Sequence, residues 1–193
     1  MSTTIYFVRH AEPDKTKFSD EMTCPLTPKG QEDCIKVTEF LRDKSIDIIF
    51  SSPYKRSVDT IAPFAQAFQH DITIINDLRE WYIGGIWIDC PKEYENFIRK
   101  SWGNPSAKIA KGESLTDLQN RNIAAILDIL KNNSGKNIVI GTHGMALSTI
   151  INHYDKTFGC SDFLRIARFW PWIVRMDFDE KGDFITWKEL LGE

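Results

Sequence analysis

Short runs of apolar, β-branched residues without polar alternation most constrain the fold of this chain. Residues 3–8 (TTIYFV) and 137–142 (NIVIGT) are the clearest examples. Such runs are typical of parallel strands that are buried on both faces of a sheet. Segments with apolar residues at helical spacing separate them. We therefore predict an α/β fold with three layers, α/β/α, in which a mostly parallel central sheet carries an antiparallel edge hairpin.

Start signals define several of the expected helices. Thr27-Pro28 and Ser52-Pro53 each combine a good N-cap residue with proline at the first helical position. Ser114 and Asp117 resemble a capping box at the start of another helix. The remaining expected elements are strands at 46–50 and 72–75, helices at 92–100 and 145–154, and a hairpin joining 172–178 to 184–187.

Composition narrows the function classes. The chain has 193 residues, which is enough for one well-buried core but short for two, so we expect a single domain over residues 1–193. A formal net charge of −3 argues against a general nucleic-acid partner. We also expect no membrane association, because no apolar stretch reaches the length of a span and a signal peptide is not recognisable. Four cysteines without a C-x-x-C pair favour reduced thiols and a cytoplasmic location.

Two histidines follow directly on the two clearest strands. His10 follows the first strand and His143 the later one, so both are expected at the carboxyl edge of the sheet, where open α/β folds bind ligands. Arg9 lies at the same edge, and Arg56 lies near the start of a helix that follows a strand. Arginine binds phosphate oxygens and neutral histidine attacks phosphorus, so this combination suits a phosphate group.

The order of the motifs along the chain is more specific than any one motif. The set comprises Arg9-His10, Leu26-Thr27 with Gly30-Gln31, residues 51–56 (SSPYKR), residues 78–80 (LRE), residues 112–114 (GES) and Thr142-His143-Gly144. This set resembles the histidine phosphatase superfamily, also called phosphoglycerate mutase-like. The resemblance spans roughly residues 3–190, although Ala11 stands where the commoner pattern has glycine.

The resemblance implies a role for each matching residue. It implies that His10 is the nucleophile, which becomes a phosphohistidine, and that Glu80 is the proton donor. It also implies that Arg9, Arg56 and His143 are catalytic together with them. The implied reaction requires no metal or other cofactor. The implied phosphate-binding residues are Arg9, His10, Arg56, His143 and Gly144. We expect no metal site at the two other histidines, His70 and His153, because they lack ligand spacing.

Our main hypothesis is a phosphomonoesterase that hydrolyses a small phosphorylated metabolite. The first alternative is phosphoglycerate mutase-type phosphoryl transfer, and the second is a catalytically silent phosphate-binding protein. Mutases of this group generally carry a basic insertion, whereas residues 81–111 contain no adjacent arginine pair. Hydrolysis is therefore favoured.

Two aromatic segments each have two interpretations. Residues 81–111 are rich in tryptophan, tyrosine and phenylalanine, and could form a lid over an organic leaving group or part of the core. Residues 169–172 (FWPW) make a homodimer a possible arrangement, but packing at the edge of the sheet explains them equally well.

Overall fold

The architecture is a single mixed sheet between two layers of helices. The computed structural model describes residues 2–16, 20–85, 88 and 90–191. Within them, six strands form a sheet in the order β3-β2-β4-β1-β5-β6. The strands are β1 (Thr3–Arg9), β2 (Ile48–Ser51), β3 (Ile72–Ile74), β4 (Asn137–Thr142), β5 (Trp172–Phe178) and β6 (Phe184–Leu191). The first four pair in parallel and the last two form an antiparallel hairpin, which confirms the predicted fold class.

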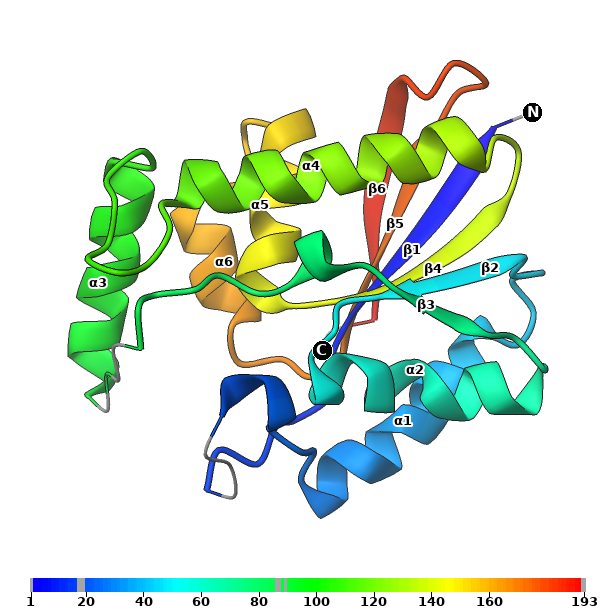
Figure 1. Cartoon of the computed structure of the whole chain (residues 1–193), viewed down its shortest axis with the longest axis horizontal. Helices are drawn as coiled ribbons and strands as arrows, with labels where there is room; N and C mark the ends of the chain where they lie inside the picture. Colours follow the sequence, from blue (N-terminus) through cyan, green and yellow to red (C-terminus); the bar gives the residue numbers. More distant parts are fainter. Residues whose placement is uncertain (1, 17–19, 86–87, 89, 192–193) are drawn as a thin grey trace.

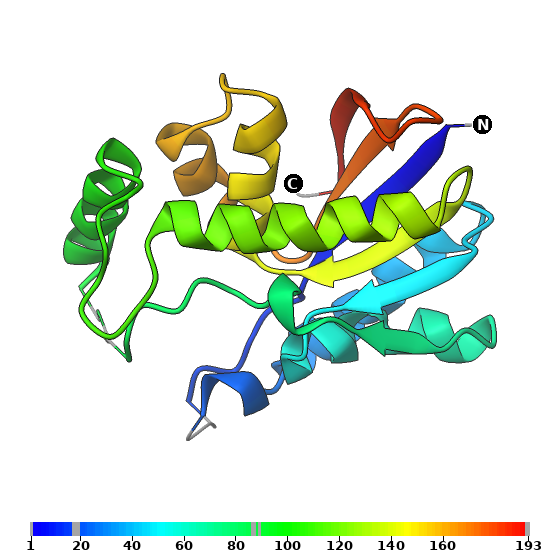
Figure 2. The ribbon, with the colours of Figure 1, turned by 45° about the horizontal axis from the view of Figure 1, so that its top comes forward.

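Helices cover both faces of the sheet (Figure 1). The helices α1 (Pro28–Leu41) and α2 (Lys55–Ala67) lie on one face. The other face is covered by α4 (Leu115–Asn132), α5 (Gly144–Tyr154) and α6 (Cys160–Ile166). A further helix, α3 (Pro91–Gly103), lies beyond the start of α4 and away from the sheet (Figure 2).

Side chains of the central strands divide between two apolar clusters. Phe7 of β1 packs in the cluster that contains Ile126 of α4, whereas its neighbour Val8 packs in the cluster that contains Ile61 of α2. All four side chains are fully buried. Burial of one such side chain contributes about 1.5–3 kcal/mol. The absence of polar alternation in β1 and β4 is therefore explained by helices on both faces.

Two of the three predicted helix starts are confirmed. The Thr27 hydroxyl accepts a hydrogen bond from the Gly30 N–H at 2.9 Å, and Ser114 and Asp117 form the reciprocal capping box. The prediction at Ser52-Pro53 is wrong, because α2 begins at Lys55 with Tyr54 as its N-cap residue. The Ser52 hydroxyl instead pairs with a histidine across the sheet, as described below.

Three short elements were not expected from the sequence. They are α6 and the 3-10 helices η1 (Glu21–Thr23) and η2 (Asn76–Leu78). Elements of three to seven residues are too short to show a periodic pattern. Only η1 and α6 have side chains at their starts that accept a backbone N–H, such as the Asp20 carboxylate that accepts from the Met22 N–H; η2 has no side-chain cap.

Several smaller expectations can be compared with the structure. All four cysteines are free thiols. Across the part of the chain that the structure describes, no helix combines the length and apolar character needed to cross a membrane. In the 169–172 cluster, Pro171 and Trp172 are buried and the two residues before them are half-buried, as packing at the edge of the sheet would produce. The homodimer stays a prediction.

Gly30 of α1 packs against the backbone of the segment that follows β1. We expect this close contact to exclude any side chain larger than hydrogen at position 30. A Cβ atom on Gly30 would lie 2.5 Å from the backbone oxygen of Glu12. Gly30→Ala should therefore lower the free energy of unfolding by about 1–3 kcal/mol, measured by urea denaturation. The control is Gly103→Ala at the end of α3, where a Cβ meets no atom within 4 Å. An equal loss of stability in both variants would contradict the steric explanation.

Candidate functional site

The register between β1 and β4 brings the two strand-terminal histidines together. Arg9 pairs with Thr142 in the parallel ladder, and the His10 N–H donates to the Thr142 carbonyl at 3.1 Å. The rings of His10 and His143 then lie 5.4 Å apart between centroids, at an interplanar angle of 61°. Both histidines are buried. The expected placement at the carboxyl edge of the sheet is confirmed.

One hydrogen bond determines which nitrogen of His10 is available. His10 Nδ1 lies 2.7 Å from the Ala11 carbonyl oxygen. A carbonyl oxygen only accepts, so Nδ1 carries the proton and Nε2 keeps its lone pair. Burial holds the pKa of His10 well below its usual value, and the charges of Arg56 and Arg9 lower it further. The ring is therefore neutral, as a nucleophile requires.

His143 is held from the neighbouring strand β2. Its Nε2 lies 2.7 Å from the hydroxyl of Ser52, the residue that follows β2. Its Nδ1 is buried and has no hydrogen-bond partner among the described residues. Burial, followed by the charges of Arg56 and His10, holds the pKa of His143 well below its usual value. His143 is therefore a second neutral imidazole with one polar atom free for a ligand.

Backbone carbonyls orient the guanidinium of Arg9. Nη1 donates to the carbonyls of Ile166 and Phe169 at 2.6 and 3.0 Å, and Nη2 donates to that of Ala167 at 3.3 Å. These bonds use both protons of Nη1, while the buried Nε has no partner among the described residues. The group therefore offers its Nε–Nη2 edge to a ligand. Burial lowers the pKa of Arg9 to about 10, so it remains cationic at neutral pH.

Gly144 keeps space beside that edge of Arg9. A Cβ atom at position 144 would lie 3.1 Å from Arg9 Nε and 3.2 Å from Cζ and Nη2. Gly144 is also the first residue of α5, directly after His143. Any larger residue would press on the guanidinium and shift it.

Arg56 reaches the site from the first turn of α2. Its guanidinium lies 4.7 Å from the centroid of the Tyr54 ring, which in turn lies 4.9 Å from the ring of His143. Arg56 is buried, and both of its terminal nitrogens contact Glu21 of η1. The predicted position of Arg56 near the start of a helix is correct, but the partner Glu21 was not expected.

Glu80 lies at the amino end of α5. Its carboxylate accepts hydrogen bonds from the N–H groups of Trp81, Met145 and Ala146 at 2.8, 3.1 and 3.0 Å. Free N–H groups and the helix dipole make this end of a helix favourable for an anion. The same helix begins at Gly144, directly after His143, so Glu80 is held close to His143.

Arg121 of α4 fixes the backbone on which Glu80 stands. It donates to the carbonyls of Asp77, Arg79 and Glu80 at 2.8, 2.8 and 2.9 Å. Its Nε and Nη2 donate to the Glu113 carboxylate at 3.0 and 2.6 Å, so Nη2 is shared between Glu80 and Glu113. The GES motif therefore contributes a carboxylate that holds Arg121, and Arg121 holds the loop that carries Glu80.

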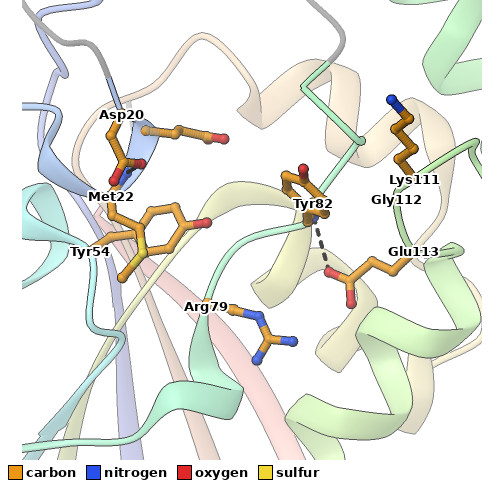
Figure 3. A pocket seen from close by; sticks show the side chains of 9 residues that line it. Asp20, Met22, Tyr54, Arg79, Tyr82, Lys111, Gly112 and Glu113 are labelled. Carbon is orange, nitrogen blue, oxygen red and sulfur yellow. Dashed lines mark hydrogen bonds between the residues drawn. The ribbon is translucent and has the colours of Figure 1, made fainter.

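A hollow of about 400 Å³ lies next to Arg56, because Glu21 and Tyr54, which both contact Arg56, line it. Figure 3 shows Tyr54, Asp20 and Met22 on one side and Tyr82, Lys111 and Glu113 on the other, with Arg79 between them. The lining residues are Asp20, Glu21, Met22, Tyr54, Arg79, Tyr82, Lys111, Gly112 and Glu113.

The aromatic residues of the 81–111 segment have different surroundings. Trp81 is buried and stacks on Phe97 at 5.4 Å, and Trp102 packs against the same core. Tyr82 is exposed and lines the hollow. Tyr94, although partly exposed, has a hydroxyl pKa raised to about 12 by burial and, to a lesser extent, by Glu80. Trp87 lies outside the described residues, and the role of the segment as a lid stays a prediction.

All six predicted site residues are brought together by these contacts. Sequence reasoning missed Ser52, Glu21 and Arg121. Ser52 belongs to the SSPYKR motif, but the sequence pattern predicts it as a helix cap. Glu21 and Arg121 carried no recognisable signal, since each acts through a contact between segments far apart in the chain. The predicted residues are Arg9, His10, Arg56, Glu80, His143 and Gly144.

Comparison with known proteins shows the family of this chain. The family model of the histidine phosphatase superfamily (branch 1) matches residues 5–186. The chain belongs to this superfamily. Its sequence is 32% identical over 156 residues to a protein of Salmonella choleraesuis named probable phosphoglycerate mutase GpmB, covering 77% of this chain and 73% of the relative.

Several proteins with solved structures share the fold of this chain. YhfR of Bacillus stearothermophilus matches with a TM-score of 0.78 at 22% identity, covering 95% of each chain. A mutant phosphoserine phosphatase of Entamoeba histolytica, in complex with phosphoserine, matches with a TM-score of 0.77 at 21% identity. That match covers 98% of this chain and 96% of the other. The superfamily, with its phosphatase and mutase-like members, makes this chain a phosphoryl-transfer enzyme.

The lowered pKa values of His10 and His143 predict a pH-dependent stability. Between their native pKa values and about 6.5, the unfolded chain binds more protons than the native protein, so stability falls as pH decreases below about 6.5. Each histidine contributes a slope of up to about 1.4 kcal/mol per pH unit. Urea denaturation between pH 7.5 and 5.5 measures the slope. In NMR, ring signals of either histidine that titrate near pH 6.5 would contradict the prediction.

Proposed function

We propose that the protein is a metal-independent phosphomonoesterase, which hydrolyses a small phosphorylated metabolite through a phosphohistidine on His10. The observation that carries this proposal is the neutral His10, whose Nδ1 is held by the Ala11 carbonyl while two buried guanidiniums lie nearby. The arginines supply positive charge where a phosphoryl group needs it, and the free nitrogen of His10 supplies the nucleophile.

The first step is attack by His10 Nε2 on phosphorus. The N–P bond forms while the bond from phosphorus to the ester oxygen breaks, in line with the attack. The Nε–Nη2 edge of Arg9 and the guanidinium of Arg56 bind the equatorial oxygens, and His143 binds a third. An arginine in such a position contributes roughly a thousandfold or more to the rate.

Glu80 transfers a proton to the leaving oxygen. Because three N–H groups donate to its carboxylate, the proton is best supplied by a substrate that binds as the phosphate monoanion. Glu80 passes this proton to the departing oxygen, so that an alcohol leaves instead of an alkoxide. The carboxylate then takes a proton from the water that attacks phosphorus, and the bond between His10 Nε2 and phosphorus breaks. Glu80 returns this proton to the departing phosphate, so that Glu80 and His10 regain their starting states.

The hollow beside Arg56 supports hydrolysis of a small substrate. About 400 Å³ accommodates a compact organic leaving group, and Tyr54 and Tyr82 offer it apolar surface. Of the basic residues between 81 and 111, only Lys111 lines this hollow. Arg99 pairs with Glu95 on α3, and Lys108 lies 3.9 Å from Asp117. The contacts of residues 81–111 therefore do not support the basic insertion that the resemblance implies for a mutase.

A phosphoglycerate mutase is the second candidate. The 32% identity to the Salmonella choleraesuis protein favours it, because that relative is named for the mutase reaction. Incubation with 3-phosphoglycerate separates the two activities by product. Release of inorganic phosphate supports the esterase, whereas faster formation of the isomer supports the mutase.

His10→Ala should abolish covalent labelling. With a ³²P-labelled monoester, the wild-type protein is expected to carry an acid-labile, base-stable label that the variant lacks. A screen of phosphorylated sugars, nucleotides, glycerates and p-nitrophenyl phosphate, without added metal, measures turnover in parallel. Labelling that persists in the variant would remove His10 from the nucleophile role. If the wild-type protein were inert towards the whole panel, a silent phosphate-binding protein would be the better description.

Glu80→Gln should keep the size of the side chain and the two hydrogen bonds that Oε1 accepts from Trp81 and Ala146, but it loses the bond from the Met145 N–H and removes the proton carrier. We expect kcat to fall about 10²–10⁴-fold for a substrate with a poor leaving group such as an alkyl phosphate. The fall should be much smaller for p-nitrophenyl phosphate, whose leaving group needs no proton. The control is Glu39→Gln on an exposed position of α1. Equal effects on the two substrates would contradict the role in proton transfer.

A further inference from the structure

Arg56 is already engaged by a carboxylate in this structure. Its Nη2 lies 3.2 Å from Oε1 of Glu21, and its Nη1 donates to the Glu21 backbone oxygen at 2.8 Å. The side chain of Arg56 is 6% exposed and that of Glu21 is 48% exposed. The pair therefore joins a buried cation of the site to a surface segment, η1.

Glu21 also lies at the border between the two parts of the site. It lines the hollow, as does Tyr54, whose ring packs between Arg56 and His143. Glu21 consequently contacts Arg56 and lines the hollow at the same time.

We propose that Glu21 is a specificity-determining residue, which competes with phosphoryl oxygens for Arg56 and selects against negative charge on the leaving group and against free phosphate. This inference rests on the proposed function, because it assigns Arg56 to the phosphoryl group. Neutral or cationic leaving groups are then preferred over anionic ones.

The charges around Glu21 explain why it discriminates. A phosphate dianion on the same guanidinium would bring like charges within a few ångströms. Arg56 is the main cation facing Glu21, Lys15 adds a smaller attraction, and Glu80 adds repulsion. Burial, together with Glu80, raises the pKa of Glu21, and Arg56 opposes this. Once phosphate binds Arg56, the Glu21 carboxylate loses its main cationic partner and repels an anionic leaving group that lies against it. Arg79 and Lys111 also line the hollow and offset part of this repulsion, so the selection acts on groups that lie next to Glu21.

Calorimetric binding of inorganic phosphate tests the inference without relying on turnover. Glu21→Gln should bind phosphate on the order of tenfold more tightly than the wild-type protein, because the repulsion is removed. The matched control is Asp20→Asn. Asp20 lines the same hollow and caps η1 through the Met22 N–H, which asparagine also caps well, and no contact joins it to Arg56. Its phosphate affinity should change less than about twofold.

Esters with differently charged leaving groups provide a second readout. Glu21→Gln should lower KM for phosphoglycolate more than for phosphoethanolamine, with a smaller change in kcat. An unchanged or weaker phosphate affinity in Glu21→Gln would overturn the inference, as would an equal gain in Asp20→Asn. If affinity rises as expected but no ester is hydrolysed by the wild-type protein, the proposed function fails while the competition for Arg56 stands.

Discussion

The parallel pairing of β1 with β4 is the constraint on which the site depends. Arg9 and Thr142 are register partners, and each is followed by a histidine in the sequence. His10 and His143 therefore leave the sheet side by side at the same edge. A shift by one residue would turn one side chain to the opposite face. The apolar runs that hold this register are buried by helices on both sides, so the stability of the core and the geometry of the site have the same origin.

The buried guanidiniums of Arg9 and Arg56 require hydrogen-bond acceptors or negative charge nearby. Different groups of the protein supply these partners. Carbonyls at the end of α6 hold Arg9, the carboxylate of Glu21 holds Arg56, and both imidazoles remain neutral. Glu80 is in turn stabilised by backbone N–H groups. The electrostatics thus favour one extra anion between the arginines, while Glu21 sets a limit on how much negative charge that anion can bring.

Much of the fold and most of the site could be predicted because their signals are local. The buried strands, the caps at Thr27 and Ser114, and the histidines after β1 and β4 depend on neighbouring residues. The error at Ser52 has a specific cause. A serine followed by proline is a good helix start, but here the Ser52 hydroxyl forms a hydrogen bond with His143, which follows another strand. Local preference was overruled by a contact between residues 91 positions apart.

The sequence by itself determined the α/β layers, the family and the six residues expected around phosphate, because these follow from periodic patterns and the order of short motifs. Only the tertiary structure decided which nitrogen of His10 is free, which edge of Arg9 faces a ligand, and how Arg121 holds the Glu80 loop. It also revealed Glu21 on Arg56. These features depend on distances between groups far apart in the chain, and such distances are fixed only when the layers pack.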